Sequence, residues 1–232
     1  RVGGPVGRTQ LNDLALSGAP MVDLFGPKAC YTMRREHGQG ADMLRASIER
    51  WGVRNNSAGI DPKTMVDLTD RIRPDGTLDW QPPTGRWKIV RVGWTTCGHA
   101  AAPSVANARF YLIDPLQEGA VEAHWQGYPH SMISRFGPEA GGAITAVETD
   151  SWEAGNLNWT KGFAAEFEKR RGYSLARYWP VLAGGHVVGD ALESERFLRD
   201  FRLTLAELIS ENYYGEAARL AKQDGVEYWA ES

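Results

Sequence analysis

Long apolar runs are missing from this 232-residue chain, and cysteine is scarce. No run approaches the ~18 residues that a membrane span needs, so we expect no membrane-spanning helix. Cys30 and Cys97 are too few for a dense disulfide framework, and they form no metal-binding pattern. The formal net charge of −3, without a long run of Lys or Arg, argues against nucleic acid as a partner. The apolar content is nevertheless sufficient for a packed core.

Several common catalytic motifs are absent as well. The sequence contains no G-x-S-x-G nucleophile elbow, no P-loop, and no dinucleotide-binding fingerprint preceded by a strand. The five histidines show neither zinc-binding spacing nor a neighbouring nucleophile, so we interpret them as structural or surface residues. Serine hydrolase, NTPase and dehydrogenase functions are therefore disfavoured.

The pattern of residues divides the chain into three regions. Residues 1–63 read as an irregular N-terminal segment with one short helix at 41–52, which ends at a glycine. Residues 64–113 contain short runs rich in β-branched and aromatic residues, separated by PDG and PPTG turns, which predicts a small antiparallel β region. Residues 114–232 alternate helices and strands, which predicts an incomplete (β/α) barrel.

The third region provides the most specific fold prediction. AITAVETD and VEYWA read as strands separated by helices, which predicts a parallel pair joined right-handedly. Within the crossover, Asn158 or Thr160 can cap one helix, and Asp190 with Glu193 resembles a capping box that opens a long apolar-striped helix. The fold class is therefore α/β, a partial (β/α)8-type barrel with a small antiparallel β region before it.

Acidic residues gather at the ends of both predicted strands. Glu148, Asp150 and Glu153 lie in AVETDSWEAGNLNWT, and Glu231 directly follows the second strand. The carboxyl ends of parallel strands form the ligand-binding edge of such folds, and two carboxyls there are what glycoside hydrolysis requires. Capping of helices or pairing with arginines explains the same acids about equally well. Glu148 and Asp150 share strand parity and are candidates for binding a cation or sugar hydroxyls.

Aromatic residues are abundant, with nine tryptophans and eight tyrosines. Most are expected in the core, because aromatic side chains dominate burial. Trp152 and Trp159 flank the acidic cluster, so they are our candidates for a platform on which a sugar ring stacks.

Three segments together carry a family resemblance: DGTLDWQPPTGRWKIVRVGWTTCG, TDSWEAGNLNWTKGFAAEFEKRRGYSLARYWPVLAG and ESERFLRDFRLTLAELISENYYGEAARLAKQDGVEYWAES. From about residue 64 to the end, the chain resembles the α-L-rhamnosidases of glycoside hydrolase family 106. The elements DSWE, NWT, EF, RRGY and ERFLRDFR occur in order, which is more specific than any one of them. The chain departs from the family at Asp114, Pro115 and Leu116, where a lysine-containing segment is expected.

The resemblance implies a large multidomain enzyme with a (β/α)8-type barrel, dependent on calcium and periplasmic or secreted in its full-length form. Its reaction would be inverting hydrolysis of terminal α-L-rhamnosides of plant or microbial glycans, with Glu153 as general acid. The general base would lie downstream of this chain, which we therefore interpret as an inactive fragment. Asp150, Trp152, Trp159 and Glu231 would then contact substrate, and Glu148 and Asp150 are the candidate metal ligands.

Two alternatives remain open from the sequence. Glu153 and Glu231 are candidates for the complete carboxyl pair of a retaining glycosidase. Alternatively, the aromatic residues bind glycan in a non-catalytic carbohydrate-binding protein, and the acids only contact hydroxyls or calcium.

Overall fold

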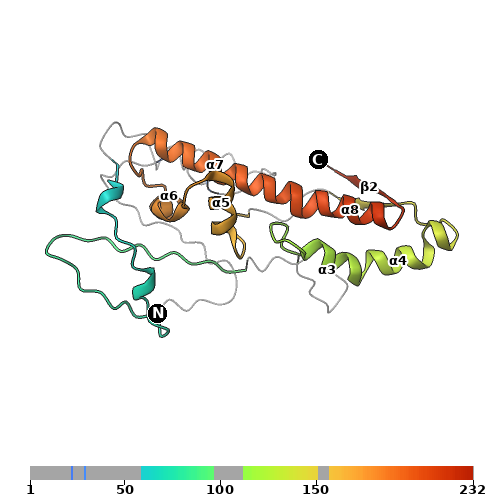
Figure 1. Ribbon diagram of the computed structural model, residues 1–232, viewed down its shortest axis with the longest axis horizontal. Helices are drawn as coiled ribbons and strands as arrows, with labels where there is room; N and C mark the ends of the chain where they lie inside the picture. The colour runs from blue at the N-terminus through green and yellow to red at the C-terminus, as the bar shows by residue number, and fades with distance from the viewer. Residues whose placement is uncertain (1–21, 23–28, 30–58, 97–111, 151–156, 232) are drawn as a thin grey trace, which may run out of the picture.

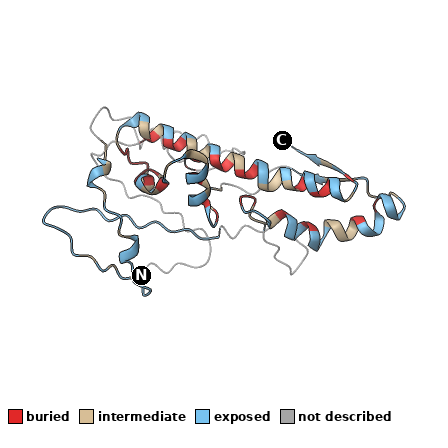
Figure 2. Ribbon diagram, viewed as in Figure 1, coloured by how far each residue is buried: buried red, intermediate tan, exposed pale blue. Residues whose placement is uncertain are grey.

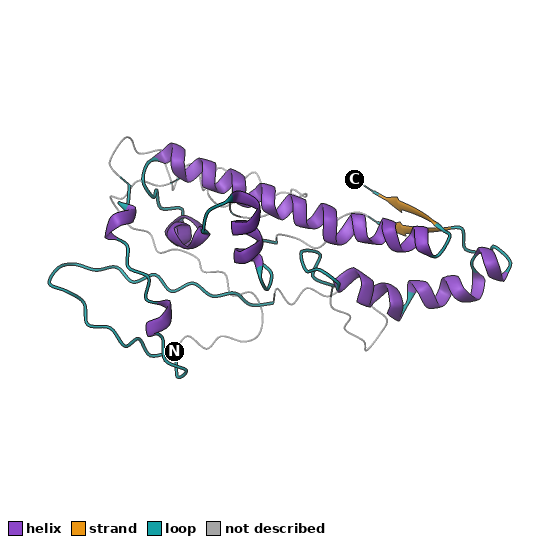
Figure 3. Cartoon of the chain, viewed as in Figure 1, coloured by secondary structure: helices purple, strands orange, loops and turns teal. Residues whose placement is uncertain are grey.

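A computed structural model describes residues 22, 29, 59–96, 112–150 and 157–231 (Figure 1). Figure 3 shows that helices dominate this part of the chain, with one small sheet. None of the helices in the described ranges is long and apolar enough to cross a membrane. The elements in chain order are η1 (Pro62–Thr64), η2 (Thr69–Arg71), α3 (Ala120–Gly127), α4 (Pro129–Phe136), η3 (Pro138–Ala140), β1 (Ala146–Thr149), α5 (Phe163–Arg171), η4 (Leu175–Tyr178), α6 (Trp179–Gly184), α7 (Ala191–Ile209), the π-helical η5 (Ser210–Gly215), α8 (Glu216–Gln223) and β2 (Glu227–Ala230).

Strands β1 and β2 pair in parallel, as the sequence predicts. Their register places Ala146 opposite Glu227 and Thr149 opposite Ala230. A backbone bond of 3.0 Å from the Glu231 N–H to the Thr149 carbonyl extends the pairing beyond the last residues of both strands. The described residues therefore confirm an α/β chain with a parallel strand pair, while they contain no barrel.

The elements α7, η5 and α8 follow one another directly and form one long helical rod. Asp190 caps α7 by accepting a 2.7 Å hydrogen bond from the Glu193 N–H, which confirms the predicted start. The predicted apolar stripe is also confirmed, since Leu198, Phe201 and Leu205 are buried. The rod continues without a break through η5 into α8, which ends before Gly225 (Figure 1).

Two apolar clusters lie toward opposite ends of this rod, one against α7 and the other against α8 (Figure 2). In the first, which we call the α5–α7 core, the Phe197 ring stacks on Tyr178 with centroids 4.3 Å apart. In the second, the sheet core, Trp125 from α3 and Leu220 from α8 pack with Val147 and Tyr228 of the strands. The helices therefore cover one face of the sheet, and the α5–α7 core supports the other end of the rod.

The strands expected between residues 64 and 96 do not form in this structure. Within these residues the only antiparallel pairing is a single bridge between Ile72 and Leu78. Trp87, Ile89 and Trp94 are exposed. High β-propensity alone does not form a strand, because a strand also needs a partner strand that takes its backbone hydrogen bonds. The predicted helix at 41–52 lies outside the described residues, and the boundaries of the three regions stay a prediction.

The predicted cap of α5 is wrong. The helix begins after Gly162, whose φ of 83° is a left-handed conformation that favours glycine, and neither Asn158 nor Thr160 caps it. The Thr160 hydroxyl donates instead to Asp114, 46 residues earlier. A long-range hydrogen bond has taken the side chain that local reasoning assigned to the helix end.

Candidate active site

The carboxyl edge of the sheet brings two predicted site residues together. Asp150 follows β1 and Glu231 follows β2, so the register that pairs Thr149 with Ala230 places the two acids beside each other. Both residues are exposed. The edge is therefore acidic and open, as expected for a ligand-binding edge of parallel strands.

The two faces of the sheet differ in character. Val147 and Tyr228, opposite each other, pack into the sheet core, whereas Glu148 and Trp229 are exposed on the other face. Because side chains alternate along a strand, Glu148 shares its face with Asp150. Trp229 is 56% exposed, and its indole N–H donates to the Glu227 carboxylate at 3.0 Å. Trp229 is not among the site residues predicted from the sequence, although its period-2 spacing from Glu227 and Glu231 is a signal for this shared face.

Tyrosine side chains pack near the end of β1. The Tyr228 hydroxyl lies 2.8 Å from the Thr149 hydroxyl, one of them donating to the other. Tyr213 and Tyr214 of η5 contact each other edge to face, with centroids 5.0 Å apart. Burial raises the pKa of Tyr213 and Tyr228 above the usual value, so both stay neutral at pH 7. This layer fixes the end of β1 without adding charge.

Of the aromatic candidates, only Trp159 belongs to the described residues. It is half-buried and contacts the α5–α7 core, with ring centroids 5.1 Å from Phe163 and 5.3 Å from Trp179. Trp152 and Glu153 lie outside the described residues, in 151–156. Their roles, and the role of Trp159 toward a sugar, stay predictions.

A chain of hydrogen bonds links the residues that follow this segment to the long rod. The Thr160 hydroxyl donates to Asp114 Oδ2 at 2.6 Å, and the Leu116 N–H donates to Asp114 Oδ1 at 3.0 Å. Asn212 of η5 donates from its side-chain amide to the Leu116 carbonyl at 2.8 Å. Asp114 and Leu116 thus have a structural function here.

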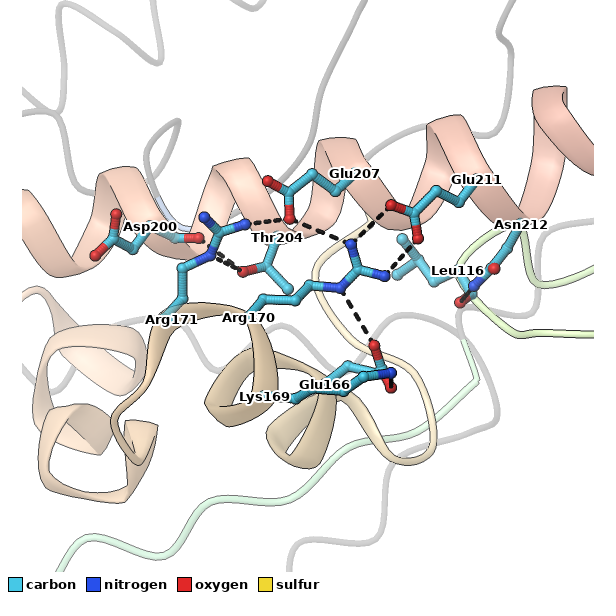
Figure 4. A network of polar contacts seen from close by, with 10 residues as sticks. All are labelled: Leu116, Glu166, Lys169, Arg170, Arg171, Asp200, Thr204, Glu207, Glu211 and Asn212. Carbon is cyan, nitrogen blue, oxygen red and sulfur yellow. Dashed lines mark hydrogen bonds and ion pairs between the residues drawn. The ribbon is translucent and has the colours of Figure 1, made fainter.

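A cluster of charges holds α5 against the rod (Figure 4). Arg170 bonds Glu166, Glu207 and Glu211, while Arg171 bonds Glu207 and the Thr204 hydroxyl. Hydrogen bonds from the two guanidinium groups hold the pKa of Glu207 and Glu211 below the usual value. We call these six residues, Glu166, Arg170, Arg171, Thr204, Glu207 and Glu211, the arginine network.

The described residues do not by themselves form a calcium site. No three of their His, Cys, Asp and Glu side chains gather closely enough to hold a metal ion. Calcium takes about six to eight oxygen ligands, so Glu148 and Asp150 on an exposed strand face are insufficient. Calcium therefore stays an expectation from the family.

The parallel strands and their acidic carboxyl edge define an α/β protein whose ligand site is expected at that edge. This chain belongs to glycoside hydrolase family 106, the α-L-rhamnosidases, whose sequence profile matches residues 4–232. The family resemblance seen in the sequence is thereby confirmed.

Two individual proteins are similar to this chain. The structure of a rhamnosidase from Novosphingobium sp. PP1Y superposes with a TM-score of 0.69 at 28% identity, covering 91% of this chain and 20% of that one. A protein of Formosa agariphila named "Putative beta-glucuronidase" is 35% identical over 176 residues, which is 76% of this chain and 15% of that protein. The chain thus spans about a fifth or less of the length of either relative.

Proposed function

We propose that this chain is part of the catalytic region of a glycoside hydrolase that cleaves terminal α-L-rhamnosides, with Glu153 as the general acid. Family membership supports the reaction class. The observation that carries the site is the acidic edge, where Asp150 and Glu231 lie beside each other. Glu153 follows Asp150 by three residues in the sequence.

The proposed mechanism is inverting hydrolysis. The acid protonates the departing glycosidic oxygen while a second carboxylate activates water on the opposite face of the sugar, about 6.5–9.5 Å away. A general acid of this kind works with a pKa raised toward neutrality, by a neighbouring like charge or by exclusion of water. Asp150, Trp159 and Glu231 contact the sugar. We assign the base to another part of the (β/α)8-type barrel that the family resemblance implies.

The position of Glu231 favours one alternative mechanism. In a retaining enzyme the two carboxyls, here Glu153 and Glu231, lie only about 5–5.5 Å apart. A pair of acids that follow neighbouring strands at one edge suits that separation. Proton NMR of the first product decides between the mechanisms, because inversion releases β-L-rhamnose and retention releases α-L-rhamnose. We expect the β anomer first.

The Formosa relative provides the second candidate substrate, a β-glucuronide, through its name. Turnover of p-nitrophenyl α-L-rhamnoside and p-nitrophenyl β-D-glucuronide by the full-length protein that carries this chain separates the two. We expect turnover of the rhamnoside. Turnover of the glucuronide alone would replace the proposed substrate while leaving the reaction class intact.

Glu153→Gln in the full-length protein tests the acid. General acids contribute about 10²–10⁴-fold, so we expect a loss of that size with phenyl rhamnoside, whose poor leaving group needs a proton. The loss should be much smaller with 2,4-dinitrophenyl rhamnoside, which departs without one. Glu168→Gln, at an exposed position on α5, is the matched control and should leave both rates unchanged. Equal losses with both substrates would remove Glu153 from the acid role.

A further inference from the structure

The long rod changes from α-helical to π-helical geometry at one place in the described residues, the turn η5. A π turn spaces its hydrogen bonds from residue i to i+5, is rare, and is frequent at functional sites. Gly215 makes the wide turn possible, because a Cβ there would lie 2.9 Å from the Ser210 carbonyl oxygen. The turn is therefore a specific feature of this sequence rather than a fraying helix end.

Consecutive residues of the turn contact different segments of the chain. Glu211 pairs with Arg170 of α5, and the next residue, Asn212, bonds the Leu116 carbonyl. Tyr213 then packs against both apolar clusters, and Tyr214 packs against the α5–α7 core. One turn of helix thus holds α5, the 114–116 segment and the layer beneath the sheet edge in a fixed relation.

The contact of Asn212 is transmitted to Thr160. Both carboxylate oxygens of Asp114 are engaged, one by the Leu116 N–H and the other by the Thr160 hydroxyl. Rotation of this carboxylate would therefore break at least one bond. Because Thr160 is only 4% exposed, water does not readily replace a lost partner there. Asn212, Leu116, Asp114 and Thr160 form what we call the Asn212 relay.

We propose that Asn212 and Asp114 are positioning residues for the proposed reaction, because the relay fixes Thr160 just downstream of the segment that carries Glu153. The upstream end is fixed separately, at Thr149, by β2 and Tyr228. This inference rests on the proposed function. Neither Asn212 nor Asp114 acts on the sugar directly; the relay sets where the acid stands. A misplacement of about 1 Å is enough to cost up to ~10²-fold in rate.

Two sets of variants of the full-length protein test the relay. Asn212→Asp keeps the shape of the side chain but replaces the amide donor by a carboxylate oxygen that faces the Leu116 carbonyl. Thr160→Val removes the hydroxyl at nearly constant volume, and Thr160→Ser restores it. With phenyl rhamnoside we expect kcat to fall about 10- to 100-fold in Asn212→Asp and Thr160→Val, with KM little changed. The loss should be smaller with 2,4-dinitrophenyl rhamnoside, and Thr160→Ser should recover most of the rate.

Ser194→Ala is the structural control. The buried Ser194 hydroxyl bonds both the N–H and the carbonyl of Val188, at 2.9 and 3.0 Å. It lies 18 residues before Asn212, about 27 Å along the rod. This variant should lower the Tm as the relay variants do, without altering the ratio of rates for the two leaving groups.

The outcomes separate the two proposals. If the relay variants lower the Tm but keep the parent's kcat and leaving-group ratio, the relay is structural only and the positioning role is overturned. If the full-length parent itself cleaves no rhamnoside, the proposed function fails and the positioning role falls with it. Should Asn212→Asp not fold, the comparison of Thr160→Val with Thr160→Ser gives the decision.

Discussion

Replacing Glu207 by alanine should loosen α5 from α7 more than replacing Glu211 does, although Glu211 binds Arg170 through both of its carboxylate oxygens. In the arginine network, Glu207 contacts both guanidinium groups (Figure 4). The side chain of Arg171 is only 12% exposed and that of Glu207 is 32% exposed. Removing one partner of a fully buried ion pair costs about 3–5 kcal/mol. Because water reaches a third of Glu207, we expect about 2 kcal/mol for Glu207→Ala.

Glu211 provides the matched comparison. It engages Arg170 through both oxygens, at 2.9 and 2.5 Å, but its side chain is 54% exposed. Exposed ion pairs contribute about 0–1 kcal/mol, and Arg170 keeps Glu166 and Glu207 when Glu211 is removed. We therefore expect Glu211→Ala to cost less than about 1 kcal/mol. Burial, and not the number of bonds, decides the order.

Hydrogen exchange of the α5 amides in the full-length protein measures the free energy that each variant loses. A loss of about 2 kcal/mol corresponds to about 30-fold faster exchange where local opening controls the rate. The amides of β1 serve as an internal reference and should not change. Exchange accelerated as much by Glu211→Ala as by Glu207→Ala would refute the reasoning from burial.

Four further predictions concern other parts of the chain. Hydrogen bonds from Arg171 and Arg170 lower the pKa values of Glu207 and Glu211 from 4.5, and bonds from Lys169 and then Arg170 lower that of Glu166, so the stabilisation from these glutamates is present above about pH 4.5 and lost on further acidification; α5 exchange measured between pH 7 and 3.5 checks this. Phe197→Ala should cost about 3–5 kcal/mol in α7 exchange, and Phe197→Leu clearly less. Gly215→Ala should lower the Tm, opposite to the gain of about 1 kcal/mol usual inside helices, because its Cβ would meet the Ser210 carbonyl; a raised Tm would contradict the steric argument. Trp159→Phe should raise KM for rhamnosides at similar Tm, whereas a lower Tm with unchanged KM would place Trp159 in the core alone.

Elements with local signals could be predicted from the sequence. The long helix has a capping aspartate at its start, an apolar stripe through Leu198, Phe201 and Leu205, and Gly225 just beyond its end. Both strands are apolar runs separated by a helical crossover, and that order is sufficient to predict parallel pairing. The place of Asp150 and Glu231 at one edge follows directly from that pairing.

Features that depend on distant partners could not be predicted. Thr160 looks like a helix cap until Asp114 is known to lie beside it. The π turn depends on Gly215, which in sequence is one glycine within a helical pattern. The runs near Trp87 and Trp94 have high β-propensity, but they form no strand in the described residues, because propensity does not provide the partner strand.

The two ends of the segment that carries Glu153 are held by different kinds of bond. Upstream, the backbone bond from the Glu231 N–H to the Thr149 carbonyl does not depend on which side chain residue 231 carries. Substitutions of Glu231 therefore change the chemistry of the edge without moving the strands. Downstream, the relay consists largely of side-chain bonds, so we expect substitutions of Asn212 or Thr160 to loosen the position of Thr160 while the acids at the edge stay the same. Leaving-group dependence separates these effects, because only a displaced or missing proton donor makes a poor leaving group selectively slow.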